Sequence, residues 1–175
     1  MMRKITVLLL TALLLAGCGA RSAGNKIDDQ VIHPNVNRAL KDAHPDLSAP
    51  TTHTVVTSYN GVVLIAGETP REDLKQIATR AAKSVEGVKV VHNELRVAYP
   101  TPINIRANDT LLTAKVKARL TAETDVPSTK VKVVTVNGVV YLLGIVSRTE
   151  ADNITYAVRQ VGGVQKIVRL FEYIN

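Results

Sequence analysis

The chain has 175 residues, of which 46% are hydrophobic and 3% aromatic, with one cysteine, no tryptophan and a formal net charge of +7. This apolar content is typical of a globular protein, and it excludes a disordered chain and one held together by disulfides. The positive charge does not indicate nucleic-acid binding, because the aromatic side chains that stack on bases are nearly absent.

The N-terminal segment is typical of an export signal. Arg3 and Lys4 precede an apolar run over residues 5–16. A run of about a dozen residues is too short to cross a bilayer as a helix, which takes about twenty. Residues 1–17 are therefore predicted to be a secretory signal peptide that is removed from the mature protein.

The signal closes on Leu-Ala-Gly followed by Cys18, which resembles a bacterial lipobox. The resemblance implies that Cys18 becomes the first residue and carries acyl chains such as palmitate, and several chains anchor a protein stably. Gly19 follows, instead of the aspartate that retains lipoproteins at the inner membrane in enterobacterial sorting. The expected location is the outer membrane, lipid-anchored on its periplasmic face, with residues 18–27 as a lipidated tether.

Removing the signal leaves roughly 158 residues, enough for one medium domain or two small ones. The positive charge of this region is uneven. Residues 21–102 hold ten Lys or Arg against nine Asp or Glu, whereas residues 103–175 hold ten against six. The basic excess therefore lies in the C-terminal half of the chain.

The first predicted helix has apolar residues at the i, i+4, i+8 spacing of a single helix face. These residues are Ile32, Val36 and Leu40. Pro34 lies in the same segment, and proline is tolerated in the first turn of a helix, so the helix is expected to begin near Pro34 or to be distorted there. The preceding pair, Asp28 and Asp29, resembles a helix start.

A β-hairpin is predicted next, around Asn60-Gly61. An Asn-Gly pair between β-branched runs favours a type I′ turn, which needs positive φ at both central residues. A helix follows and is expected to end at Gly87, because glycine adopts the left-handed cap conformation easily. The other elements expected in this unit are strands over 54–58 and 88–97 and a helix over 71–85.

The same pattern recurs in the second half. Residues 59–67 match residues 136–144, and residues 85–88 match residues 161–164. The apolar face of the first helix recurs as Leu112, Val116 and Leu120. The remaining elements are expected as strands over 130–136 and 164–174 and a helix over 148–161 that ends at Gly162-Gly163. Three correspondences in the same order indicate an internal duplication.

Each copy is therefore predicted to be an αββαβ domain, with a three-stranded mixed sheet and two helices on one face, which makes the chain α+β. The domains are expected at 28–99 and 108–175. The linker over 100–107 contains two prolines, so it is expected to be semi-rigid. Because each sheet keeps an uncovered face and two edges, domain 1 is expected to pack on domain 2.

Two features of both copies resemble the BON domain: a strand glycine, and a Gly-Val pair that opens the last strand. They are Gly67 and Gly144, and Gly87-Val88 and Gly163-Val164. Together with the lipobox, they resemble the dual BON-domain outer-membrane lipoproteins of the DolP (YraP) type. This resemblance implies a non-enzymatic protein that faces the periplasm and supports envelope integrity. It also implies binding of anionic phospholipid through the first helix of the second domain, where such proteins can carry a tryptophan at the position of Leu111.

The residues of that helix are compatible with contact to a membrane. If Leu112, Val116 and Leu120 face the sheet, a rotation of 100° per residue places a strip of Leu and Ala on the opposite side, bordered by basic side chains. The predicted lipid-binding residues are Leu111, Ala114, Lys115, Lys117, Ala118 and Arg119. An apolar strip between cations suits a helix that lies at an anionic membrane surface.

A second interpretation stays open, in which both domains form a protein-docking scaffold for an envelope assembly. Such a scaffold would use exposed sheet edges or the Leu111 face, without direct recognition of lipid. No metal site is expected, because the four histidines lack ligand spacing and lipidation would leave no thiolate. No enzyme activity or cofactor is expected either, because the sequence has no Gly-rich phosphate loop and no nucleophile elbow. His53 and His92 are predicted on strands that could be neighbours.

Overall fold

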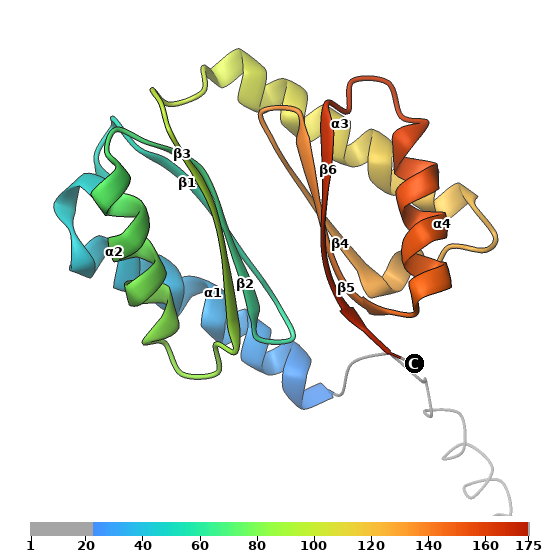
Figure 1. Cartoon of the computed structure of the whole chain (residues 1–175), viewed down its shortest axis with the longest axis horizontal. Coiled ribbons are helices and arrows are strands. Elements are labelled where there is room, and N and C mark those ends of the chain that lie inside the picture. The colour runs from blue at the N-terminus through green and yellow to red at the C-terminus, as the bar shows by residue number, and fades with distance from the viewer. Residues whose placement is uncertain (1–22, 175) are drawn as a thin grey trace, which may run out of the picture.

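The computed structural model of the protein describes residues 23–174 (Figure 1). The predicted signal peptide, the predicted lipidation site Cys18 and residues 19–22 of the predicted tether lie outside the described residues. Within the described part, no helix combines the length and the apolar character needed to cross a membrane.

The chain folds as two successive αββαβ units. The elements of the first are α1 (Ala23–Ala43), the 3-10 helix η1 (Pro45–Ser48), β1 (His53–Tyr59), β2 (Val62–Thr69), α2 (Glu72–Lys83) and β3 (Val90–Val97). Those of the second are α3 (Ile103–Ala122), the 3-10 helix η2 (Ser128–Lys130), β4 (Val131–Val136), β5 (Val139–Val146), α4 (Arg148–Arg159) and β6 (Lys166–Tyr173). The predicted α+β class and the duplication are both confirmed.

Each domain contains a three-stranded mixed sheet whose second strand is central. The strand orders are β1-β2-β3 and β4-β5-β6. In both sheets the first two strands are antiparallel, and the last strand runs parallel to the second. Because β2 separates β1 from β3, the expectation that His53 and His92 lie on neighbouring strands is wrong.

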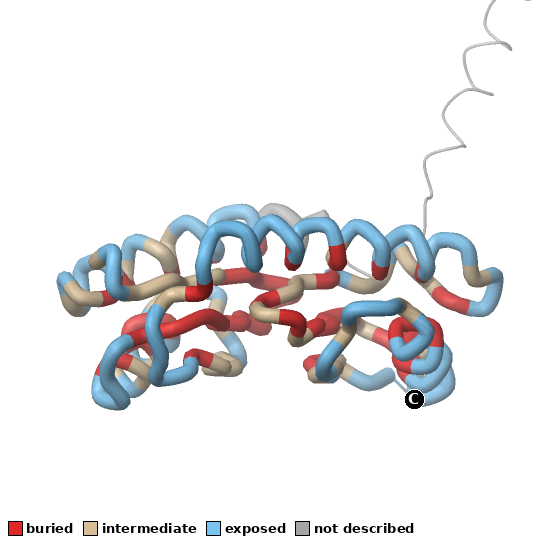
Figure 2. Tube along the Cα trace, turned by 90° about the horizontal axis from the view of Figure 1, so that it is seen from above, coloured by how far each residue is buried: buried red, intermediate tan, exposed pale blue. Residues whose placement is uncertain are grey.

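The two sheets face each other in the middle of the molecule, with α1 and α2 outside one sheet and α3 and α4 outside the other (Figure 1). Each domain has its own core between helices and sheet. A third apolar cluster joins the two sheets, and its buried members are Tyr59, Val62, Leu64, Ala66, Val136, Tyr141, Leu143 and Leu170. Seen from above, buried residues lie along the middle of the molecule and the helices carry the exposed ones (Figure 2).

Side-chain hydrogen bonds cross the same interface. They run from Tyr59 Oη to the Lys130 carbonyl (2.8 Å), from Lys132 Nζ to the Ser58 carbonyl (3.1 Å) and from Asn60 Nδ2 to Glu172 Oε1 (2.9 Å). The domains thus contact each other through the sheet faces that their own helices leave uncovered.

Both hairpins turn at an Asn-Gly pair, as predicted. Asn60 and Gly61 have φ angles of 55° and 80°, and Asn137 and Gly138 have φ angles of 48° and 72°. Positive φ at both central residues matches the right-handed twist of the flanking strands, which explains why this pair occurs in both copies.

A buried aspartate on the first helix of each domain binds the hairpin turn. The Asp29 carboxylate accepts hydrogen bonds from the N–H groups of both turn residues, at 2.8 and 3.2 Å. Asp109 does the same in the second domain, at 2.7 and 2.8 Å. The interpretation of Asp29 as part of a helix start is wrong, because α1 already begins at Ala23. The carboxylate instead joins the helix to the sheet.

The two strand glycines are required by the close approach of the backbone at the start of the neighbouring edge strand. A Cβ atom at Gly67 would lie 1.9 Å from the carbonyl oxygen of His53, and one at Gly144 would lie 2.6 Å from that of Lys130. A strand glycine often marks such a contact with another backbone. Any side chain at either position would clash with this carbonyl oxygen, which explains why both copies have glycine there.

The glycines that follow the second helices do not cap them, which corrects the expectation. Helix α2 has Ser84 as its C-cap and α4 has Gln160, both in the right-handed region. Gly87 and Gly163 lie further along, with φ of 84° and 100°. They turn the loop that leads into the last strand.

Two helices begin earlier than the sequence patterns predict. Helix α1 runs through Pro34, so it does not begin there, and it includes residues 23–27 of the predicted tether. Helix α3 begins at Ile103, so residues 103–107 of the predicted linker are helical. The connection between the domains is consequently shorter than expected, and α3 presents a longer surface.

Candidate functional site

Helix α3 buries one face and exposes the opposite one. Leu112, Val116 and Leu120 are at most 3% exposed and belong to the core of the second domain. The six predicted lipid-binding residues are all exposed: Leu111, Ala114, Lys115, Lys117, Ala118 and Arg119. Leu111 is 61% exposed, although its side chain is large and apolar.

The exposed apolar strip is longer than the sequence analysis predicted. Ile103 (79% exposed) and Ala107 precede Leu111 by eight and four residues, so they lie on the same side of the helix. Both lie within the predicted linker over residues 100–107. The i, i+4 spacing back from Leu111 is the signal that could have identified them. We call the exposed residues Ile103, Ala107, Leu111, Ala114 and Ala118 the outer strip of α3.

Basic side chains border the outer strip on both sides. The helical rotation places Arg106 and Lys117 on one side and Lys115 and Arg119 on the other. The guanidinium of Arg119 pairs with the carboxylate of Glu123, which offsets part of its charge. The other three cations form no ion pair within residues 23–174, so their charges are available to a ligand.

The corresponding surface of α1 differs in its chemistry. Val31, 53% exposed, takes the place of Leu111, but the uncharged Asn35 takes the place of Lys115. Pro34 also lies on this exposed side, and the exposed Arg38 takes the place of Ala118. A cation therefore interrupts the apolar side of α1, whereas on α3 the cations border a continuous apolar strip.

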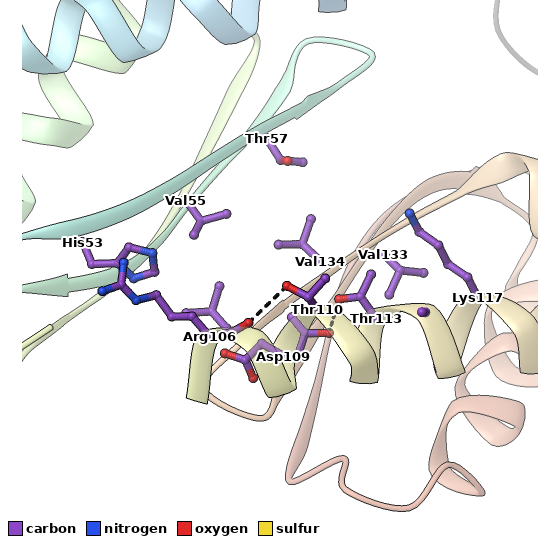
Figure 3. Close-up of a pocket in the computed structure, with 13 residues that line it drawn as sticks. His53, Val55, Thr57, Arg106, Asp109, Thr110, Thr113, Lys117, Val133 and Val134 are labelled. Carbon is purple, nitrogen blue, oxygen red and sulfur yellow. Dashed lines mark hydrogen bonds between the residues drawn. The ribbon is translucent and has the colours of Figure 1, made fainter. Parts of the chain in front are cut away.

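A groove of about 540 Å³ lies between α3 and the first domain (Figure 3). Its lining side chains come from α3, from β4 and from the interdomain side of β1. This lining also includes Ala114, a member of the outer strip, and Lys117, which borders the strip. The six predicted residues thus lie on one helix but belong to two different surfaces. One surface is the outer strip with its bordering cations, and the other is the groove, which runs along one side of α3.

The start of α3 is held in place by a buried carboxylate of β2. Glu68 is 1% exposed and accepts hydrogen bonds from the Thr101 hydroxyl (2.7 Å) and from the Thr101 N–H (3.2 Å). Its other partners are His53 Nδ1 at 3.2 Å and Arg96 at 3.3 Å. Burial by itself would raise the pKa of Glu68, but the hydrogen bonds from Thr101 and His53 outweigh it, so the pKa lies below its ordinary value. The linker is thereby fixed to the first domain.

Acidic side chains at the starts of the second helices have structural roles. Glu72 and Asp73 lie in the first turn of α2, and Glu150 forms a capping box with Ser147 at the start of α4. Hydrogen bonds from Lys130 and Ser147 hold the pKa of Glu150 below its ordinary value. No three His, Cys, Asp or Glu side chains of residues 23–174 gather as metal ligands.

Both halves of the chain match the BON-domain family model, over residues 28–99 and 108–175. The chain belongs to the BON-domain family. Among curated BON-domain relatives, it is similar to the outer membrane lipoprotein DolP of Haemophilus influenzae, with 33% identity over 99% of this chain and 97% of that protein. The tandem BON architecture predicted from the two repeats is confirmed.

Two further relatives have different names. A 21 kDa hemolysin of Actinobacillus pleuropneumoniae is 35% identical over 89% of this chain and 79% of its own length. The osmotically-inducible protein Y of Escherichia coli is also 35% identical, over 82% of this chain and 72% of that protein. The similarity therefore extends across both BON domains.

Proposed function

We propose that this protein is a non-enzymatic outer-membrane lipoprotein that binds anionic phospholipid through α3 and supports envelope integrity. The observation that carries the proposal is the outer strip of α3 with its bordering cations. The similarity to an outer membrane lipoprotein over nearly the whole chain supports the location. Acyl chains on Cys18 would anchor the protein, with both domains on the periplasmic face.

The physical argument combines apolar burial with charge. Full burial of a leucine side chain contributes about 1.5–3 kcal/mol. Leu111 is already partly covered, and its 61% exposure leaves roughly 1–2 kcal/mol for insertion among lipid headgroups. Each basic group near an anionic surface adds about 1 kcal/mol. Contacts of this size are weak singly, but an anchored chain needs little affinity, because the tether keeps α3 close to the bilayer.

The test is co-sedimentation of the chain from Gly19 to Asn175, without acyl chains, with vesicles of anionic or zwitterionic lipid. Binding is expected to anionic vesicles only, and to weaken as ionic strength rises, because salt screens the lysine–phosphate attraction. Leu111→Asp should abolish sedimentation. Lys115→Ala should weaken it about fivefold, the equivalent of about 1 kcal/mol.

Matched controls come from α4. Tyr156 is 65% exposed, so Tyr156→Asp introduces the same charge at an exposed apolar position of another helix. Arg159→Ala removes an exposed cation from that helix. Both controls should sediment like the unmodified chain. Absence of anionic-vesicle binding at low salt, or equal losses in the controls, would contradict recognition by α3.

A further inference from the structure

The outer edge of β4 is not paired with another strand of the described chain, since β4 pairs only with β5. The two-residue turn makes Val136 and Val139 the closing hydrogen-bonded pair of the hairpin. Alternation along the strand then points the N–H and C=O groups of Val133 and Thr135 away from β5. The first domain supports this assignment, because the equivalent register points the Ser58 carbonyl away from β2. There it accepts a hydrogen bond from Lys132.

This free edge forms the floor of the interdomain groove (Figure 3). One wall is α3, which contributes Arg106, Thr110, Ala114 and Lys117. The opposite wall is the interdomain side of β1, which contributes His53, Val55 and Thr57. A volume of about 540 Å³ lies within the range of ligand sites. An edge strand beside a helix provides the main-chain groups and side pockets that take up an extended peptide.

The charges of the groove favour an acidic occupant. Arg106 and Lys117 point toward it and have no ion-pair partner within residues 23–174 (Figure 3). The carboxylate in the lining, Asp109, already accepts two backbone N–H groups of the hairpin turn. His53 lies at the same end as Arg106, and its Nδ1 is bonded to Glu68. The uncompensated charge of the lining is therefore positive.

We propose that this groove binds an extended acidic peptide segment of a partner protein, which adds a strand to the free edge of β4. Side chains of an added strand alternate between the two walls. One set then meets the cations of α3, and the other set meets Val55 and Thr57 of β1. The occupant is accordingly a segment that alternates acidic with β-branched residues.

The spacing of the cations fits this occupant. Arg106 and Lys117 are eleven residues apart on α3, which corresponds to roughly 16 Å along the helix axis. Acidic residues four apart in a strand lie about 13 Å apart. The long side chains of arginine and lysine bridge the difference. A segment of about six residues spans both cations.

The probe is a fluorescein-labelled hexapeptide of alternating valine and glutamate, titrated with the chain from Gly19 to Asn175 and followed by fluorescence anisotropy. Saturable binding is expected, whereas the corresponding valine–lysine peptide should not bind. Lys117→Glu should weaken binding by about tenfold or more, because it reverses a lining charge. Lys166→Glu is the matched control, since Lys166 is an exposed residue of β6 outside the groove lining, and it should bind like the unmodified chain.

Thr135→Pro tests the main-chain contact. Proline removes an N–H that faces the groove, and edge strands tolerate it. Because the substitution also removes the hydroxyl that accepts a bond from Thr113, Thr135→Val is measured beside it. The valine variant keeps the N–H, so it should bind at least about fivefold more tightly than the proline variant. Hydrogen exchange at the Val133 and Thr135 amides should slow when the peptide is added.

The proposal is overturned if the acidic peptide gives no anisotropy change up to about 1 mM. It is also overturned if the lysine peptide binds equally well, or if the proline and valine variants bind alike. Leu111→Asp tests the proposed lipid contact separately, because Leu111 does not line the groove, whereas Lys117 borders both surfaces. This variant should lose vesicle sedimentation and keep peptide binding. Failure of either property is thus distinguishable from failure of the other.

Discussion

Replacing Asp109 should destabilise the second domain strongly, although the residue lies outside its apolar core. Its carboxylate accepts hydrogen bonds from the N–H groups of Asn137 and Gly138, at 2.7 and 2.8 Å. The side chain is 6% exposed as part of α3, so water does not readily replace it. A hydrogen bond to a charged group contributes about 1.5–3 kcal/mol, and a buried donor left without a partner adds to the loss.

Asp109→Ala is therefore expected to lower the free energy of unfolding by about 2–4 kcal/mol, since Asn137 is half-exposed and recovers part of its loss from water. Asp109→Asn retains one acceptor oxygen, so its loss should be roughly half as large. Urea unfolding followed by circular dichroism measures both values. The control Asp125→Ala removes an exposed carboxylate just beyond α3 and should stay within about 0.5 kcal/mol. A loss below about 1 kcal/mol for Asp109→Ala, at an unchanged denaturant slope, would refute the claim that this carboxylate holds the turn.

Three further predictions use the same unfolding assay. Because the pKa of Glu68 is lowered in the folded state, its carboxylate stabilises the fold at pH values above its ordinary value of 4.5 and loses this effect as the pH falls through the folded value. Glu68→Gln should accordingly lower the free energy of unfolding at neutral pH and reduce its further decrease in acid. If the free energy of unfolding falls equally steeply below pH 4.5 in the variant and in the unmodified protein, this explanation is contradicted. Tyr59→Phe removes the bond to the Lys130 carbonyl and should cost about 0.5–1.5 kcal/mol, and no measurable change would argue against an ordered contact between the domains. Gly144→Ala places a Cβ atom 2.6 Å from that same carbonyl and should cost about 1–3 kcal/mol, so a neutral substitution would disprove the steric explanation.

Most of the element order was predictable because its signals are local. The Asn-Gly turns depend on the φ preferences of two residues, and the buried faces of α1 and α3 follow from the helical period. The start of α3 was not predictable in the same way. Two prolines precede it, yet the helix begins directly after Pro102 and is positioned by a bond from Thr101 to Glu68. Glu68 is distant in sequence, so no local pattern indicates that contact.

The candidate site was predictable to the extent that it depends on one helix. The spacing of Leu111 and its basic neighbours identifies an exposed apolar strip, because rotation along a helix is fixed. The roles of Asp29 and Asp109 were missed, since an aspartate near a helix start usually caps it. The signal that could have corrected this is its recurrence: an aspartate precedes the first core residue, Ile32 or Leu112, by three positions in both copies.

The sequence by itself determined the duplication, the αββαβ order of each copy and the exposed face of α3. The tertiary structure alone decided how the two sheets meet and where the groove lies. Along β2 every residue is buried, with Val63 and Ile65 in the core of their own domain and Leu64 in the cluster between the sheets. Both faces of this strand are similarly apolar, so alternation cannot tell which face meets the helices and which meets the other domain. That choice places β1 opposite α3 and leaves the β4 edge between them.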